Sequence, residues 1–216
     1  MRASDAGGSR DAIALQKPNV PLYSFPGHPL RRGAVVYRAH GSKNGPWWFA
    51  STPDGRFNLE TPHGTCYVAR DIETAVEEVL APAAGGMRIV SEAQADSFVV
   101  SRLKPSKSYT LANIASAKAK SKSFGATREM SGAAGGVYVI TRLWAAALAA
   151  AGFNGILYAS RFTTVMSENA IALFGAAGAP SPPPSIDPTP LSGREAAVAA
   201  GYTVLPPLTR SHLTLI

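Results

Sequence analysis

The sequence is poor in cysteine, in charged residues and in long apolar runs. Its 216 residues include a single cysteine, Cys66, so neither an intrachain disulfide framework nor a multi-cysteine zinc site can form. The histidines lack metal-ligand spacing and we expect no metal; they are His28, His40, His63 and His212. The longest apolar run, LWAAALAAAGF, is far shorter than the roughly 20 residues of a membrane-spanning helix.

Several catalytic and targeting motifs are also absent. The sequence contains no GxSxG nucleophile elbow, no P-loop and no HExxH motif. No GxGxxG follows a strand, which argues against a Rossmann cofactor site, and we expect no cofactor. The N-terminal stretch MRASDAGGSRDA lacks the apolar segment of a signal peptide. We therefore expect a soluble, cytoplasmic protein.

What the sequence does contain is enough apolar material for one domain with a core. Hydrophobic residues make up 46% of the chain, while 20 glycines and 17 prolines predict many turns and loops. The formal net charge is +7, which favours an anionic ligand such as a nucleic acid, a nucleotide or an acidic partner.

Local composition divides the chain into three parts. Residues 1–32 carry several prolines and no periodicity, which predicts an extended, partly disordered N-terminal arm. Residues 33–178 contain the strand and helix patterns of a central domain. A proline-rich linker at 179–190 opens a C-terminal extension, 179–216. Within the central domain, the small, polar and basic stretch 113–136 predicts a mobile surface loop.

Short strands and two or three helices mix without regular βαβ alternation, so the predicted class is α+β. Strands are predicted at 34–40, 65–69, 97–103, 136–140, 155–160 and 169–174. Asp71 is predicted to cap a helix whose apolar residues from Ile72 to Leu80 recur at helical spacing. A second helix is predicted from a Thr141 cap to residue 151, closed by Gly152. A short helix and an extended piece are predicted after residue 192.

Three polar positions interrupt these apolar elements. Arg38 lies within strand 34–40, on the face opposite Tyr37, where it is either solvent-facing or a rigid guanidinium that binds phosphate or carboxylate. Glu77 and Glu78 flank the apolar stripe of the first helix on opposite sides, so periodicity leaves open which of them reaches a cleft. Ser160 ends the strand-like run GILYAS, a position typical of turn residues and also of functional groups.

Aromatic side chains gather in the first third of the central domain. Either they pack against one another in a loop, or they form a stacking wall for a planar ring such as nicotinamide or a base. They are Tyr37, Trp47, Trp48, Phe49, Phe57 and Tyr67.

In order and spacing, several blocks of the sequence resemble the RES domain family. VVYRAH resembles its first block, with Arg38 as the family arginine. GRFN resembles its Gly-Arg-Trp-Asn block, with Arg56 as a second arginine and Phe57 in place of the usual tryptophan. GTCYVARDIETAVEEVL resembles the strand–helix block and selects Glu78. AGFNGILYASRF and ENAIALF resemble later blocks, with Ser160 and Asn169.

The resemblance covers about residues 34–175 and carries expectations about fold and reaction. Members of the family are bacterial toxins that degrade NAD, often encoded beside an antitoxin. The implied fold is that of ADP-ribosyltransferase-like toxins, a split, bent β core with flanking helices. The implied reaction is cleavage of the nicotinamide–ribose bond of NAD, which is therefore a substrate and not a cofactor.

The resemblance also implies roles for individual residues. The catalytic group is Arg38, Glu78 and Ser160: the arginine clamps the pyrophosphate, the glutamate faces the ribose, and the serine orients the glutamate or the nicotinamide end. Arg56 is the second arginine of the clamp. The substrate-binding group is Arg56, Tyr67, Tyr37, Trp48, Phe57 and Asn169. Tyr67 and one residue of the tryptophan-rich segment are expected to wall the nicotinamide ring.

Other readings stay open on sequence alone. The same pocket would serve an ADP-ribosyltransferase or an NAD phosphorylase. A nucleic-acid-binding module without catalysis would use the basic loop residues Lys118, Lys120, Lys122 and Arg128, and salt-dependent binding would reveal it; we rank nucleic acid well below NAD as a partner. A catalytically inactive scaffold is a third reading.

Further suggested partners are a cognate antitoxin over the Arg38–Glu78 cleft and a second copy in a homodimer; no membrane partner is expected. The C-terminal extension is an alternative cover for the cleft.

Overall fold

The computed structural model describes residues 16–84, 87–121, 124–126, 130, 138–160, 162, 170–181 and 184–207. The strands are β1 (Gly27–Leu30), β2 (Val36–His40), β3 (His63–Ala69), β4 (Ile89–Ser91), β5 (Val99–Lys104), β6 (Tyr109–Asn113), β7 (Gly155–Tyr158), β8 (Ala170–Ala176), β9 (Ser185–Ile186), β10 (Leu191–Ser192) and β11 (Thr203–Leu205). The helices are α1 (Ile72–Ala84), α2 (Glu92–Ala95), α4 (Tyr138–Ala150) and α5 (Gly193–Ala199).

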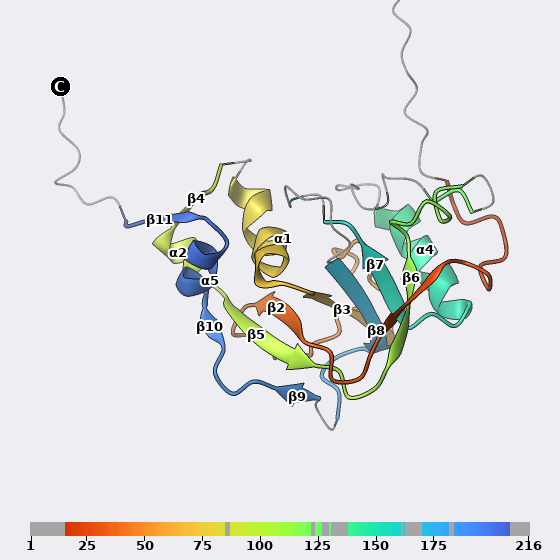
Figure 1. The fold of residues 1–216 in the computed structure, drawn as a ribbon, viewed down its shortest axis with the longest axis horizontal. Helices are drawn as coiled ribbons and strands as arrows, with labels where there is room; N and C mark the ends of the chain where they lie inside the picture. The colour runs from red at the N-terminus through yellow and green to blue at the C-terminus, as the bar shows by residue number, and fades with distance from the viewer. Residues whose placement is uncertain are drawn as a thin grey trace, which may run out of the picture.

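Most strands belong to one curled sheet with helices packed against it (Figure 1). Its strand order is β1-β6-β7-β8-β3-β2-β5-β10, with β9 also paired to β5. Neighbouring strands run antiparallel except for the parallel pair of β6 and β7. β4 and β11 form a separate parallel pair. The predicted α+β class with a bent β core and flanking helices is confirmed. Within the described residues, no helix is long and apolar enough to cross a membrane.

The inner face of the sheet encloses a core made only of strand and loop residues. Fully buried side chains come from six strands: Val36, Cys66, Leu103, Leu111, Leu157, Ile171 and Leu173. Trp47 and Phe49 join this core from the loop between β2 and β3. A Cβ on Gly175 would lie 2.8 Å from the Phe49 ring, so the absence of a side chain there lets the ring pack on the sheet.

The outer face of the sheet carries the helices. Alternation and register place Tyr37, Tyr67 and Tyr158 on this face, because Tyr37 pairs with Ala69, and both Ala69 and Tyr158 pair with Ala170. α4 covers one end of the face and α5, with β4 and β11, covers the other (Figure 1). α1 lies between them (Figure 1).

Capping interactions explain where α1 begins and where α4 ends. Asp71 Oδ1 accepts a hydrogen bond from the Thr74 amide at 2.7 Å, which confirms the predicted N-cap of α1. As predicted, Gly152 closes the C-terminal end of α4 just after its last helical residue, and its φ of 93° is left-handed. There, Phe153 N donates to Leu148 O at 3.1 Å and Gly152 N to Ala149 O at 3.0 Å, the bonds of a Schellman motif.

The start of α4 differs from the prediction. Tyr138–Ile140 form its first turn instead of a strand, and Thr141 lies inside the helix instead of capping it. Residues 136–137 lie outside the described part of the chain. Thr141 is fully buried, and its hydroxyl donates to the Arg56 carbonyl at 2.5 Å and to the Tyr138 carbonyl at 3.0 Å. Threonine is common at helix N-caps, so a threonine inside a helix whose hydroxyl binds backbone carbonyls is easily mistaken for a cap from sequence alone.

Two segments that we expected to lie outside the core contribute to it. In the N-terminal arm, β1 pairs with β6, and Leu22 and Phe25 are buried. In the loop 113–136, five apolar side chains are buried in the cluster that includes α4 residues: Ile114, Ala119, Phe124, Ala126 and Met130. Both segments hide their apolar residues among prolines, serines and lysines, so periodicity does not reveal them. Residues 1–15, Lys122 and Arg128 lie outside the described part, while Lys118 and Lys120 are exposed.

Candidate active site

A cavity of about 320 Å³ opens on the outer face of the sheet, between α1 and the first turn of α4. Its polar lining combines one carboxylate and one buried guanidinium with four phenols. Glu78 comes from α1 and Arg56 from the loop before β3. The phenols are Tyr37, Tyr67, Tyr138 and Tyr158. Elements far apart in sequence therefore bring opposite charges and aromatic rings to one concave site.

The structure distinguishes the two glutamates that helical periodicity left open. Glu77 is 2% exposed, and its Oε2 accepts a hydrogen bond from the Tyr202 hydroxyl at 2.7 Å. Its Oε1 lies 2.7 Å from Arg88 Nη2, an ion pair without hydrogen-bond alignment. Glu78 instead borders the cavity, and its buried Oε1 has no hydrogen-bond partner among the described residues. An unpaired buried carboxylate oxygen is costly, which is typical of a group that binds a ligand.

Arg56 is held rigidly while part of its guanidinium stays unpaired. The residue is 8% exposed, and its Cζ lies 5.9 Å from the Phe57 ring centroid and 5.8 Å from that of Tyr158. Its backbone carbonyl is fixed by Thr141, as described above. Arg56 Nε is buried without a hydrogen-bond partner among the described residues. A fixed planar cation with an unused donor suits an anionic group such as a phosphate.

The tyrosines form an aromatic wall of the cavity. Burial raises the pKa of Tyr67 and of Tyr158, the Glu78 charge adds to both shifts, and Arg56 opposes them. The Tyr67 hydroxyl accepts a hydrogen bond from Phe57 N at 2.8 Å. Phe57 is fully buried and meets Tyr158 edge-on at 5.2 Å between centroids. Phe57 thus supports Arg56 and Tyr158 from the core.

Arg38 is among the residues that border the cavity, but its guanidinium makes its hydrogen bonds on the inner face of the sheet. Its Nη1 donates to the carbonyls of Pro46 and Trp48, each at 2.8 Å, and lies 2.9 Å from Cys66 Sγ. Arg38 therefore ties the loop after β2 to the inner core. Burial raises the pKa of the Cys66 thiol to about 11, and the Arg38 charge partly opposes the shift.

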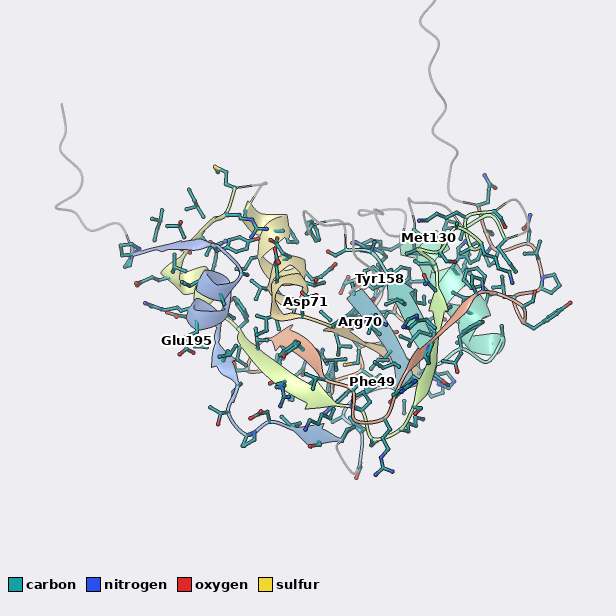
Figure 2. The ribbon with its side chains drawn as sticks, viewed as in Figure 1. Phe49, Arg70, Asp71, Met130, Tyr158 and Glu195 are labelled. Atoms are coloured by element: carbon teal, nitrogen blue, oxygen red, sulfur yellow. The ribbon has the colours of Figure 1, made fainter. Side chains whose placement is uncertain are left out.

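The tryptophan-rich segment is not brought to this cavity. Trp47 and Phe49 are 3% and 6% exposed and belong to the inner core, and Trp48 is half-buried outside the cavity lining. Tyr158 and Phe49 belong to different buried clusters, and Figure 2 shows them well apart. Two further aromatic residues line the cavity, Tyr138 and Tyr158. Sequence reasoning gave Tyr158 no role in the site, and it missed Tyr138 because it assigned this position to a strand. Extending the apolar helix pattern of α4 back by one turn would have placed it.

Ser160 does not line the described surface of the cavity. Ser160 is 3% exposed and follows Tyr158 by two positions; its hydroxyl accepts a hydrogen bond from Phe162 N at 3.2 Å. Asn169 lies outside the described residues. In the described part of the chain, no group of three or more His, Cys, Asp or Glu side chains could hold a metal ion.

Comparisons with known proteins point to one family. The family model described as the RES domain matches residues 35–192. Among solved structures, a chain of the M. tuberculosis MbcT–MbcA toxin–antitoxin complex is similar, with a TM-score of 0.59 and 11% sequence identity. The match covers 80% of this chain and 92% of that chain, and at this identity it shows a shared fold. No curated protein matches the sequence.

Proposed function

The chain belongs to the RES domain family, and on that premise we propose that it is a toxin-type enzyme that cleaves the nicotinamide–ribose bond of NAD. The observation that carries the proposal is the buried Glu78 oxygen, which has no hydrogen-bond partner among the described residues, in a tyrosine-walled cavity that Arg56 also lines. The similarity of fold to a chain of a toxin–antitoxin complex supports the toxin assignment.

The size of the cavity suits one end of the dinucleotide. Its volume of about 320 Å³ lies at the lower end of the range of small-molecule pockets, roughly 300–1,000 Å³. We assign it to the nicotinamide and its ribose. The tyrosine rings would wall the nicotinamide. The pyrophosphate would lie against Arg56, whose Nε has no partner within the described part of the chain and so could donate to a phosphate oxygen.

The chemistry needs charge stabilisation more than acid catalysis. The bond from C1′ to the ring nitrogen breaks through an oxocarbenium-like transition state, and its electron pair neutralises the cationic nitrogen of nicotinamide. Glu78 would oppose the positive charge that develops on the ribose and accept a hydrogen bond from a ribose hydroxyl. In hydrolysis, a water oxygen then bonds to C1′, and its proton passes to Glu78 or to solvent.

Arg38 and Ser160 would act beside this centre. Arg38 holds the carbonyls of Pro46 and Trp48 on the inner face of the sheet, so we assign it a positioning role for the strand that borders the cavity. Ser160 follows the cavity residue Tyr158 at the end of β7, and we assign it to the nicotinamide end.

The test is release of nicotinamide from NAD by purified protein, followed by chromatography, beside the Glu78→Gln variant. We expect release by the wild type and its loss in the variant. The co-product identifies the acceptor: ADP-ribose means hydrolysis, ADP-ribose 1-phosphate means phosphorolysis, and a modified acceptor means transfer. A folded wild type that releases no nicotinamide with water, phosphate or added protein as acceptor would refute the proposal.

We also propose a cognate antitoxin that covers the mouth of the cavity, since the similar solved chain comes from a toxin–antitoxin complex. Nicotinamide release should fall when the antitoxin is added in equimolar amount and return when it is removed. An antitoxin that binds without reducing release would show that it covers another surface.

A further inference from the structure

A buried polar contact joins the last described part of the chain to α1. The Tyr202 hydroxyl donates to Glu77 Oε2 at 2.7 Å, and both residues are at most 5% exposed. Arg88 completes the cluster: it forms the ion pair with Glu77, and its Cζ lies 5.6 Å from the Tyr202 ring centroid. Arg88 Nη1 also donates to the Ala200 carbonyl. The buried Glu77 carboxylate is thus held by the Tyr202 hydroxyl on one oxygen and faces the partly exposed Arg88 guanidinium with the other.

Apolar packing reinforces this contact on the same side of α1. Val76 and Leu80 of α1 share one buried cluster with Ala196, Ala197 and Tyr202. The backbone adds a further link, because Thr203 N donates to Arg88 O at 2.8 Å. The segment from α5 to β11 therefore covers the side of α1 that faces away from the cavity.

The cavity side of α1 carries the group on which the proposed reaction depends. Ala75, Glu78 and Val79 line the cavity, and Glu78 is the next residue after Glu77. Adjacent helical residues are fixed about 100° apart around the axis. A rotation or slide of α1 that relaxed the Glu77 contact would therefore displace the Glu78 carboxylate as well.

We propose that Tyr202 is a positioning residue: through Glu77 it sets the rotation and register of α1 and so places Glu78 in the cavity. This inference rests on the proposed function. The family match ends at residue 192, so this contact comes from a segment beyond the matched region. Catalytic geometry of this kind is sensitive, because a displacement of about 1 Å can reduce a rate by roughly 100-fold.

The experiment compares Tyr202→Phe, which keeps the ring and removes the hydroxyl, with Val90→Ala. Val90 belongs to the same buried cluster but does not contact Glu77 through a polar group, so its variant controls for loss of packing. We expect Tyr202→Phe to lower kcat for nicotinamide release by about 10-fold with little change in KM, because Arg56 and the tyrosines still bind NAD. Val90→Ala should keep the wild-type kcat at a temperature where all three proteins are folded.

The same variants are examined by amide hydrogen exchange, which needs no enzymatic activity. Tyr202→Phe should exchange faster than Val90→Ala in peptides from α1. An unchanged kcat in Tyr202→Phe, or an equal fall in Val90→Ala, would overturn the positioning role. If the wild type releases no nicotinamide, the proposed function fails. Independently of activity, α1 peptides of Tyr202→Phe that exchange as slowly as those of the wild type would refute the effect of the Tyr202 contact on α1. If Tyr202→Phe does not fold, Arg88→Gln is assessed by the same measurements.

Discussion

Glu77 and Glu78 are neighbours on α1, yet the Glu77 carboxylate is buried and hydrogen-bonded to Tyr202, while Glu78 borders the cavity. The Glu77 carboxylate accepts a hydrogen bond from a phenol and forms an ion pair with a guanidinium, whereas Glu78 keeps a buried oxygen with no hydrogen-bond partner in the described part of the chain. The first arrangement is that of a structural group, and the second is that of a group that meets a ligand.

The two carboxylates should therefore respond differently to amidation. Glu78→Gln should lower nicotinamide release by about 100- to 1,000-fold, because it removes a charge placed against the transition state. Its melting temperature should stay near that of the wild type. Glu77→Gln should instead lower the free energy of unfolding by about 1–3 kcal/mol, because it removes the buried charge that pairs with the partly exposed Arg88 guanidinium. Turnover assays and thermal melts of both variants test these predictions. Loss of activity in Glu77→Gln together with loss of stability in Glu78→Gln would exchange the roles of the two glutamates.

Arg56 should determine affinity for the anionic part of the substrate. Arg56→Gln should raise KM for NAD by about 10- to 100-fold, which corresponds to loss of one charge-assisted hydrogen bond of roughly 1.5–3 kcal/mol. Arg142→Gln is a matched control, because Arg142 pairs with Glu60 at 3.1 Å and does not line the cavity. An unchanged KM in Arg56→Gln would move the phosphate site elsewhere.

Arg38 should contribute to stability as well as to the site. Arg38→Gln leaves the carbonyls of Pro46 and Trp48 without their donor, so the free energy of unfolding should fall by about 1–3 kcal/mol. Arg102 on the neighbouring strand pairs with Asp187 at 3.6 Å on a largely exposed surface, and Arg102→Gln should be nearly neutral. Urea unfolding measures both. Equal midpoints for the two variants would show that the carbonyl contacts carry no net stability.

Cys66 should make stability fall in alkaline solution. Burial raises the pKa of its thiol to about 11 in the folded protein, against roughly 8.5 in an unfolded chain. Because the unfolded state loses its proton first, the contribution of Cys66 is present below pH 8.5 and is lost as pH rises toward 11. The free energy of unfolding of the wild type should therefore drop relative to Cys66→Ala over this interval. Parallel pH curves for the two proteins would contradict a buried neutral thiol.

Local chemistry made several elements readable from the sequence. β2, β3, β7 and β8 were placed within a few residues, because short β-branched and aromatic runs are bounded by turn residues. The Asp71 cap, the apolar stripe of α1 and the Gly152 closure of α4 involve residues within a few positions of one another. Such signals need no knowledge of distant partners.

Elements that depend on distant partners were missed or misplaced. β1 and β6 stabilise each other across the chain, with Gly27 opposite Ala112, and neither carries a strong pattern alone. The tryptophan-rich segment was a candidate ring-stacking wall, but Trp47 and Phe49 pack in the inner core instead of lining the cavity. Tyr138 entered the site because α4 begins one turn earlier than its threonine suggested.

By itself, the sequence determined the α+β class, the main strands, the cap of α1 and the pair of glutamates among which a site residue would be found. Only the tertiary structure decided that Glu77 is buried and Glu78 borders the cavity, that Arg38 binds loop carbonyls, and that four tyrosines share one wall. Helical periodicity gives the angle of a side chain relative to an apolar stripe. The partner that buries Glu77 lies 125 residues further along the chain, and only folding brings it there.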